Sequence, residues 1–169
     1  EVDRLGAKSS SFNSYLKAIQ DRREFFKGMG ATSTDHGCLE AYTTEVTDGD
    51  MQKLLDKALK RNINKDEARE FQGRMLIEMA RMSLEDGLVM QIHPGVFRNH
   101  SSFVFRRYGR DMGVDLPVET EYVRGLKPLL ERYGHEKNLK IVLFTLDDTR
   151  YTRELAPLAG YYPVLKLGP

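Results

Sequence analysis

The sequence contains a single cysteine, Cys38, among its 169 residues. One cysteine cannot form a disulfide bond within the chain, which fits a protein of the reducing cytoplasm. An excess of charge is also missing, because 26 basic side chains are balanced by 25 acidic ones and the net charge is +1. Without a long-range positive field, we expect no nucleic-acid partner, although single arginines can still hold a small anionic substrate.

Several patterns that identify functional classes are absent as well. No apolar run approaches the length of a membrane-spanning helix and no signal peptide is recognisable, so we expect a cytoplasmic protein with no membrane partner. The metal-binding spacings H-x-H, H-E-x-x-H and paired C-x-x-C do not occur, and neither does a glycine-rich phosphate loop. The chain begins without methionine, at Glu1, which suggests a processed or truncated product.

The spacing of apolar residues predicts strands that alternate with helices. Near-continuous apolarity over residues 139–146 indicates a strand that is buried on both faces, as in parallel sheets. Helices are expected at residues 12–28, 51–61, 65–86, 120–133 and 152–159, strands at 31–35, 88–92, 139–146 and 162–167, and a short helical or irregular excursion at 101–108.

This order predicts an α/β fold with parallel strands and right-handed crossovers. Four such strands fit either a small doubly wound sheet or about half of an eight-stranded (β/α)8 barrel. The last expected strand, at residues 162–167, is followed by no helix that could cover it. That feature favours the half barrel.

The stretch 88–99 is the candidate active centre. An apolar strand over 88–92 ends at the sequence His-Pro-Gly, whose proline removes a backbone donor and whose glycine permits positive φ. His93, Arg98 and Asn99 therefore lie at or just after the carboxyl end of a buried strand. Ligand sites of α/β proteins lie at such ends.

Polar residues also follow the other expected strands, where His36, Asp147 and Asp148 stand at the tips. Each of them alone has an equally good structural interpretation, as a hydrogen-bonded histidine or a solvated loop charge. Three strands that deliver such residues to one rim favour a functional interpretation. Asp35 is not expected to orient the neighbouring His36, because adjacent residues on a strand point to opposite faces.

Several segments resemble the uronate (glucuronate) isomerases, in one register from about residue 12 to residue 169. Thr34-Asp35-His36-Gly37 resembles the S/T-D-H-G segment of that family, and residues 90–99 resemble its M-Q-x-H-x-G-x-x-R-N segment. Residues 144–147 and 153–160 are similar to the family's sixth strand and the helix after it, and residues 165–169 to the start of the next strand.

The resemblance implies a (β/α)8 barrel of the amidohydrolase superfamily. Residues 1–169 would form one segment of it, roughly strands four to seven, incomplete at both ends and without a separate second domain. The implied reaction is the aldose–ketose isomerisation of D-glucuronate to D-fructuronate, and of D-galacturonate to D-tagaturonate. The implied cofactor is a divalent metal, commonly zinc, whose main ligands on strands one and eight lie outside this segment. A homo-oligomer is expected for the full-length enzyme.

Roles for individual residues follow from the same resemblance. His93 and Arg98 are the candidate catalytic residues, and His93 is also a possible metal ligand. Candidate contacts to the substrate are His36, Arg98, Asn99 and Asp147. A planar guanidinium suits a carboxylate or an enediolate, whereas no residue here is assigned as the base that moves the proton. Two alternatives stay open: a non-catalytic module that binds sugar acids, and a purely structural α/β domain.

Overall fold

The structure is a computed structural model that describes residues 11–168. Helices and strands alternate along the chain, and no helix within this range is both long and apolar enough to cross a membrane. The elements are α1 (Phe12–Gly28), β1 (Ser33–Gly37), α2 (Asp48–Leu59), α3 (Lys65–Asp86), β2 (Val89–His93), β3 (Val96–Phe97), α4 (Ser102–Tyr108), β4 (Leu116–Pro117), α5 (Lys127–Tyr133), β5 (Ile141–Leu143), α6 (Asp148–Arg150), the π-helical turn η2 (Tyr151–Leu155), α7 (Ala156–Tyr161) and β6 (Leu165–Leu167).

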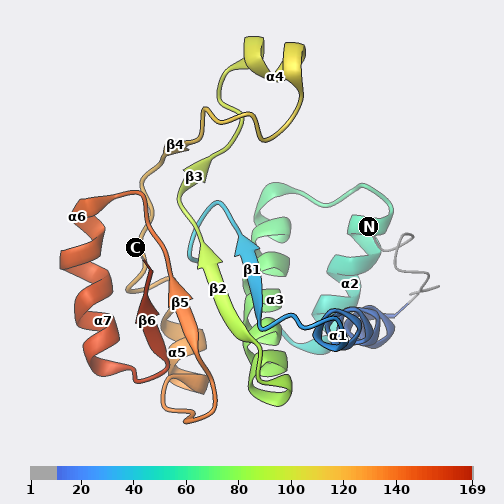
Figure 1. Cartoon of the computed structure of the whole chain (residues 1–169). Coiled ribbons are helices and arrows are strands. Elements are labelled where there is room, and N and C mark those ends of the chain that lie inside the picture. Colours follow the sequence, from blue (N-terminus) through green and yellow to red (C-terminus); the bar gives the residue numbers. More distant parts are fainter. Residues whose placement is uncertain (1–10, 169) are drawn as a thin grey trace.

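The central sheet has four parallel strands in the order β1-β2-β5-β6 (Figure 1). This order never reverses along the chain, so right-handed crossovers place the helices that cover the sheet on one face. A doubly wound sheet reverses its direction and carries helices on both faces. The structure therefore excludes that alternative and has the arrangement of a (β/α)8 barrel segment.

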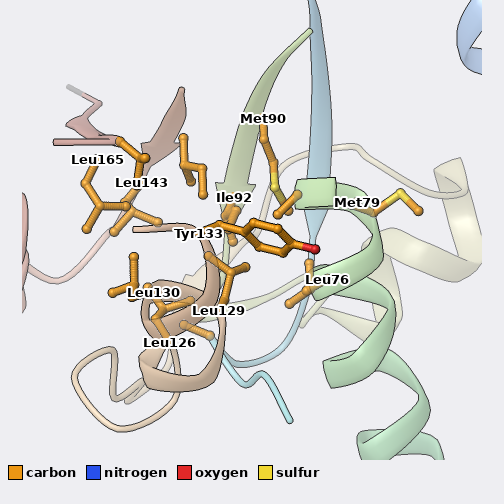
Figure 2. Packing of buried hydrophobic residues seen from close by; sticks show 14 of the residues in the cluster. Leu76, Met79, Met90, Ile92, Leu126, Leu129, Leu130, Tyr133, Leu143 and Leu165 are labelled. Atoms are coloured by element: carbon orange, nitrogen blue, oxygen red, sulfur yellow. The ribbon is translucent and has the colours of Figure 1, made fainter. Parts of the chain in front are cut away.

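The core lies between the sheet and its helices. Met90 and Ile92 of β2, together with Ile141 and Leu143 of β5, have no exposed surface. They belong to one apolar cluster with side chains of α3 and α5 (Figure 2). Because successive residues of a strand point to opposite faces, His93 points away from these helices. The face that carries His93 is thus the one that a barrel turns towards its interior.

Helix α3 begins and ends where the sequence predicts. The side chain of Asn64 accepts a hydrogen bond from the backbone N–H of Glu67 at 2.9 Å, and the Glu67 carboxylate accepts one from the N–H of Asn64 at 3.1 Å. Gly87 ends the helix with a φ of 79°, in the left-handed region that favours glycine. The prediction of a helix over 65–86 is confirmed.

The predicted helix over 120–133 is wrong in its first half, because α5 begins only at Lys127. Pro128 lies in the first turn of α5, and a proline deeper in a helix would lose a backbone hydrogen bond and clash with the preceding turn. The segment before α5 is held by side chains instead, since the N–H of Tyr122 donates to the carboxylate of Glu154 at 2.9 Å.

Residues 96–117 form an arm that projects from the body of the molecule (Figure 1). The two-residue strands β3 and β4 pair antiparallel at its base, and α4 lies at its far end with no buried residue. Pairs this short leave no periodic signal, so the sequence did not predict β3 or β4. The arm brings Asp115 back to the end of β2, beside Arg98.

Candidate active site

The ends of β2 and β5 open into a pocket of about 500 Å³. This volume lies in the range of sites that bind small molecules. Its lining includes His93, Arg98, Asp115, Phe144 and Thr145. Two residues predicted from the sequence, His93 and Arg98, therefore share one cavity at the carboxyl edge of the sheet.

An aspartate of the neighbouring strand holds the imidazole of His93. The Nδ1 atom of His93 lies 2.5 Å from Oδ1 of Asp35. A carboxylate oxygen accepts, so Nδ1 donates this hydrogen bond, and a neutral imidazole that donates from Nδ1 has its lone pair on Nε2. A carboxylate behind one ring nitrogen orients histidines that bind metals or substrates through the other. The His93 side chain is 28% exposed, so a small molecule can reach it.

An aromatic ring fixes the same imidazole from a second direction. Phe144 follows β5, and its ring stacks on that of His93 with centroids 3.9 Å apart and planes 18° from parallel. The hydrogen bond that His93 donates to Asp35 restrains the ring within its plane, whereas the stack restrains its tilt. His93 therefore has a defined orientation before any ligand binds.

Arg98 is held more loosely, at the base of the arm. Its Nη1 lies 3.3 Å from Oδ2 of Asp115, and its side chain is 50% exposed. The other oxygen of Asp115 accepts the backbone N–H of Asn99 at 3.2 Å. Asn99 has a φ of 57°, and its side-chain oxygen accepts the N–H of Asp111 at 2.9 Å. The structure thus gives the side chain of Asn99 a partner within the arm, and its predicted substrate contact stays a prediction.

His36 does not join this site. Strand β1 continues past it to Gly37, and His36 is in register with the buried Ile92, on the face opposite His93. Its Nε2 lies 3.0 Å from Oγ1 of Thr34. Burial, reinforced by the charge of Arg23, lowers the pKa of His36 to about 4. The expectation that His36 shares a rim with His93 is wrong, because the strand ends two residues later than predicted and alternation turns the ring towards the helices.

Asp147 is the N-cap residue of α6 and does not line the pocket of His93. Its Oδ1 accepts hydrogen bonds from the backbone N–H of Thr149 at 2.9 Å and from the hydroxyl of Thr149 at 2.6 Å. These hydrogen bonds hold the pKa of the Asp147 carboxyl below its ordinary value. The structure therefore gives Asp147 an N-cap role at α6, and its predicted contact to substrate stays a prediction. The neighbouring Asp148 is the first residue of α6.

Sequence reasoning missed the two residues that hold His93. Adjacency in the sequence pairs Asp35 only with His36, and Phe144 belongs to an apolar run that predicts a strand. The signal for Asp35 lay in strand pairing, because Gly37 is in register with His93 and Asp35 is two residues earlier on the same face. Of two adjacent strand residues, only one can face the site.

The partly buried His36 predicts a pH dependence of stability. Its pKa is near 6.5 in the unfolded chain and about 4 in the folded one, so the unfolded state binds more protons between these values. The free energy of unfolding should therefore fall as the pH drops from about 6.5 towards 4, and His36→Gln should weaken this dependence. Urea unfolding at about pH 7 and about pH 5 measures how the unfolding free energy changes with pH in the unsubstituted protein and in His36→Gln. An equal change in the two proteins would contradict the prediction.

The residues present fit a shared metal site rather than a complete one. Within residues 11–168, no three side chains of His, Cys, Asp or Glu come together in a way that could hold a metal ion. The available Nε2 of His93, with Asp35 behind the ring, fits one ligand of a metal whose other ligands lie elsewhere. It fits a hydrogen bond to a hydroxyl group equally well.

Comparisons with known proteins all lead to one family. The model of the family described as "Glucuronate isomerase" matches residues 2–165. The uronate isomerase of Phenylobacterium zucineum is 56% identical over 164 residues, which are 97% of this chain and 34% of that protein. The uronate isomerase of Rhizobium meliloti is 54% identical over 167 residues, 99% of this chain and 36% of that protein.

Solved structures show the same relation. The crystal structure of glucuronate isomerase from Caulobacter crescentus matches with a TM-score of 0.93 and 51% identity, over 99% of this chain and 35% of that one. Uronate isomerase from Thermotoga maritima matches with a TM-score of 0.89 and 27% identity, over 99% of this chain and 37% of that one. The chain thus spans about a third of the length of its relatives. It belongs to the glucuronate isomerase family.

Proposed function

We propose that the chain is part of a cytoplasmic uronate isomerase that converts D-glucuronate to D-fructuronate, and D-galacturonate to D-tagaturonate. Family membership supports this proposal, and the observation that carries it is that His93, hydrogen-bonded to Asp35, lines one pocket together with Arg98. The full-length enzyme is proposed to be a homo-oligomer that acts on a small sugar acid. Nucleic acid and membranes are not among its proposed partners.

The pocket supplies two functions that this isomerisation needs. The reaction moves a proton between C1 and C2 through an enediol, so the substrate must be held still while charge develops on its oxygens. The half-exposed guanidinium of Arg98 can grip the carboxylate of the substrate through two parallel hydrogen bonds. The Nε2 atom of His93 can hydrogen-bond a substrate hydroxyl, because Asp35 leaves that lone pair available.

A divalent metal such as zinc, held mainly by ligands from other parts of the enzyme, would polarise the substrate carbonyl when bound. In this segment, His93 is the residue that would join those ligands. Asp35 would then keep the imidazole in the tautomer that offers Nε2. Phe144, stacked on the ring, would keep it from tilting out of line.

Arg98→Lys tests the proposal in the full-length isomerase that carries this segment. That protein can be built by exchanging the segment for the matching third of the Caulobacter crescentus enzyme, with which it shares 51% identity. Lysine keeps the charge but loses the planar fork, so we expect kcat/KM for D-glucuronate to fall at least about tenfold. Release of the ketose product measures turnover.

Arg106→Lys is the matched control for this substitution. Arg106 lies in α4, a helix without buried residues, at the far end of the arm (Figure 1). We expect this variant to turn over D-glucuronate at the unsubstituted rate. Comparable losses in the two variants would remove Arg98 from the site. Binding of the sugar acid without turnover would instead support a non-catalytic binding module.

A further inference from the structure

Each strand of the central sheet contributes one residue to a row that crosses the carboxyl edge. Asp35 belongs to β1 and His93 ends β2, while Phe144 and Gly168 follow β5 and β6 directly. Neighbours in this row lie close together. The imidazole contacts the carboxylate on one side and the phenyl ring on the other, and a Cβ added at the glycine would overlap the phenyl ring. The row thus reaches His93 from both sides.

The backbone of Phe144 is fixed by the sheet. Its N–H donates to the carbonyl of Ile92 at 3.1 Å, which extends the pairing of β2 and β5 by one residue. Phe144 therefore lies on the same face of the sheet as His93, with its ring against the imidazole. The position of the ring depends on what lies on its other side.

Gly168 occupies that other side. A Cβ at this position would lie 2.4 Å from Cδ1 and from Cε1 of Phe144, well inside van der Waals contact. The glycine cannot withdraw, because its N–H donates to the carbonyl of Leu143 at 2.8 Å. The need for glycine here is a need for space, since any larger residue would push the phenyl ring from its place.

We propose that Phe144 is a positioning residue for His93, and that Gly168 sets the place of the Phe144 ring. This inference rests on the proposed role of His93. Asp35 alone leaves the imidazole free to tilt about its hydrogen bond, whereas the stacked ring confines it to one plane. Nε2 then points into the pocket at a fixed angle. Small misplacements of a catalytic group lower the rate steeply, so the stack should act on kcat.

Phe144→Leu in the full-length isomerase that carries this segment tests the proposal. We expect kcat to fall about tenfold with KM changed less than about threefold, because the ring acts on the reaction through the orientation of His93. Phe144→Tyr restores a flat ring and should restore kcat to within about threefold. Phe71→Leu is the control, since it removes the same atoms from α3, where Phe71 packs 6.1 Å from Tyr15.

A spectroscopic measurement separates positioning from general support of the fold. In histidine-labelled protein, the ring current of Phe144 shifts the His93 ring protons, which His93→Asn identifies by their loss. Phe144→Leu should abolish this shift and Phe144→Tyr should retain it. If Phe144→Leu does not fold, Phe144→Met keeps the bulk without the flat ring and serves instead. Loss of the shift with unchanged kcat would overturn the proposal.

Gly168→Ala tests the last contact of the row. The added methyl should displace the phenyl ring, and therefore remove the His93 shift and lower kcat as Phe144→Leu does. In the Phe144→Leu background it should have little further effect, because the two act through one contact. Additive losses, or a retained shift in Gly168→Ala, would overturn the role of Gly168. Full activity of His93→Asn would instead overturn the proposed function on which the inference rests.

Discussion

Replacing His93 with asparagine is expected to lower kcat/KM for D-glucuronate by at least about 100-fold, equivalent to roughly 2.7 kcal/mol of transition-state stabilisation. The protein should stay folded, because the imidazole lies on the pocket face of β2 and is partly exposed. Asparagine can still reach Asp35 with its amide but has no nitrogen in the place of Nε2. Steady-state kinetics and thermal unfolding of the full-length isomerase that carries this segment measure the two effects.

His135→Asn is the matched control. His135 is exposed, and its ring centroid lies 5.6 Å from that of Tyr162. We expect normal kinetics from it. Bound metal, measured by elemental analysis, then divides the two roles of His93: loss of a ligand lowers the metal content, whereas loss of a substrate contact leaves it unchanged. A His93→Asn protein with lower stability and near-normal kcat would show that His93 only supports the fold.

Gly125→Ala is expected to cost at least about 2–3 kcal/mol of unfolding free energy, through overpacking. A Cβ there would lie 2.0 Å from the carbonyl oxygen of Ala41. The segments that carry Ala41 and Gly125 cannot separate easily, because they are hydrogen-bonded to each other. The carbonyl of Gly125 accepts hydrogen bonds from the backbone N–H of Thr43 at 2.8 Å and from the Thr43 hydroxyl at 2.7 Å. Urea unfolding of the full-length isomerase that carries this segment measures the cost.

Gly28→Ala provides the comparison for this second prediction. Gly28 is the last residue of α1, and a Cβ there would meet nothing within 4 Å. Alanine at such a helical position should be neutral or stabilise by about 0.5 kcal/mol. Equal unfolding midpoints for Gly28→Ala and Gly125→Ala would mean that the segment of Ala41 moves aside at little cost.

Apolar spacing predicted the architecture well because it reports burial directly. The run of residues 139–146 indicated a strand buried on both faces, and β5 lies there as an inner strand of a parallel sheet. The limits of elements were harder to predict, because they depend on partners. β5 itself covers only Ile141–Leu143, where its register with β2 and β6 ends.

The candidate site was predictable where one strand determines it, and not where two strands must be paired. His93 and Arg98 follow one strand, and the structure places both in one pocket. Asp35 acts across a strand pair, so its role depends on a register that the sequence does not state. His36 does not lie at a strand tip for the same reason, since β1 ends two residues later than predicted, at Gly37.

The position of the strands within the sheet determines how this segment can be joined to the remainder of a barrel. β2 and β5 are the inner strands, whereas β1 and β6 each have one side that no described strand covers. Any neighbouring strand must therefore join at β1 or β6, the strand of Asp35 and the one that leads into Gly168. His93 and Phe144 lie one strand inside these seams. A neighbouring strand that pairs imperfectly would therefore displace Asp35 or Gly168 first. His93 and Phe144 would be displaced only indirectly, through these two residues.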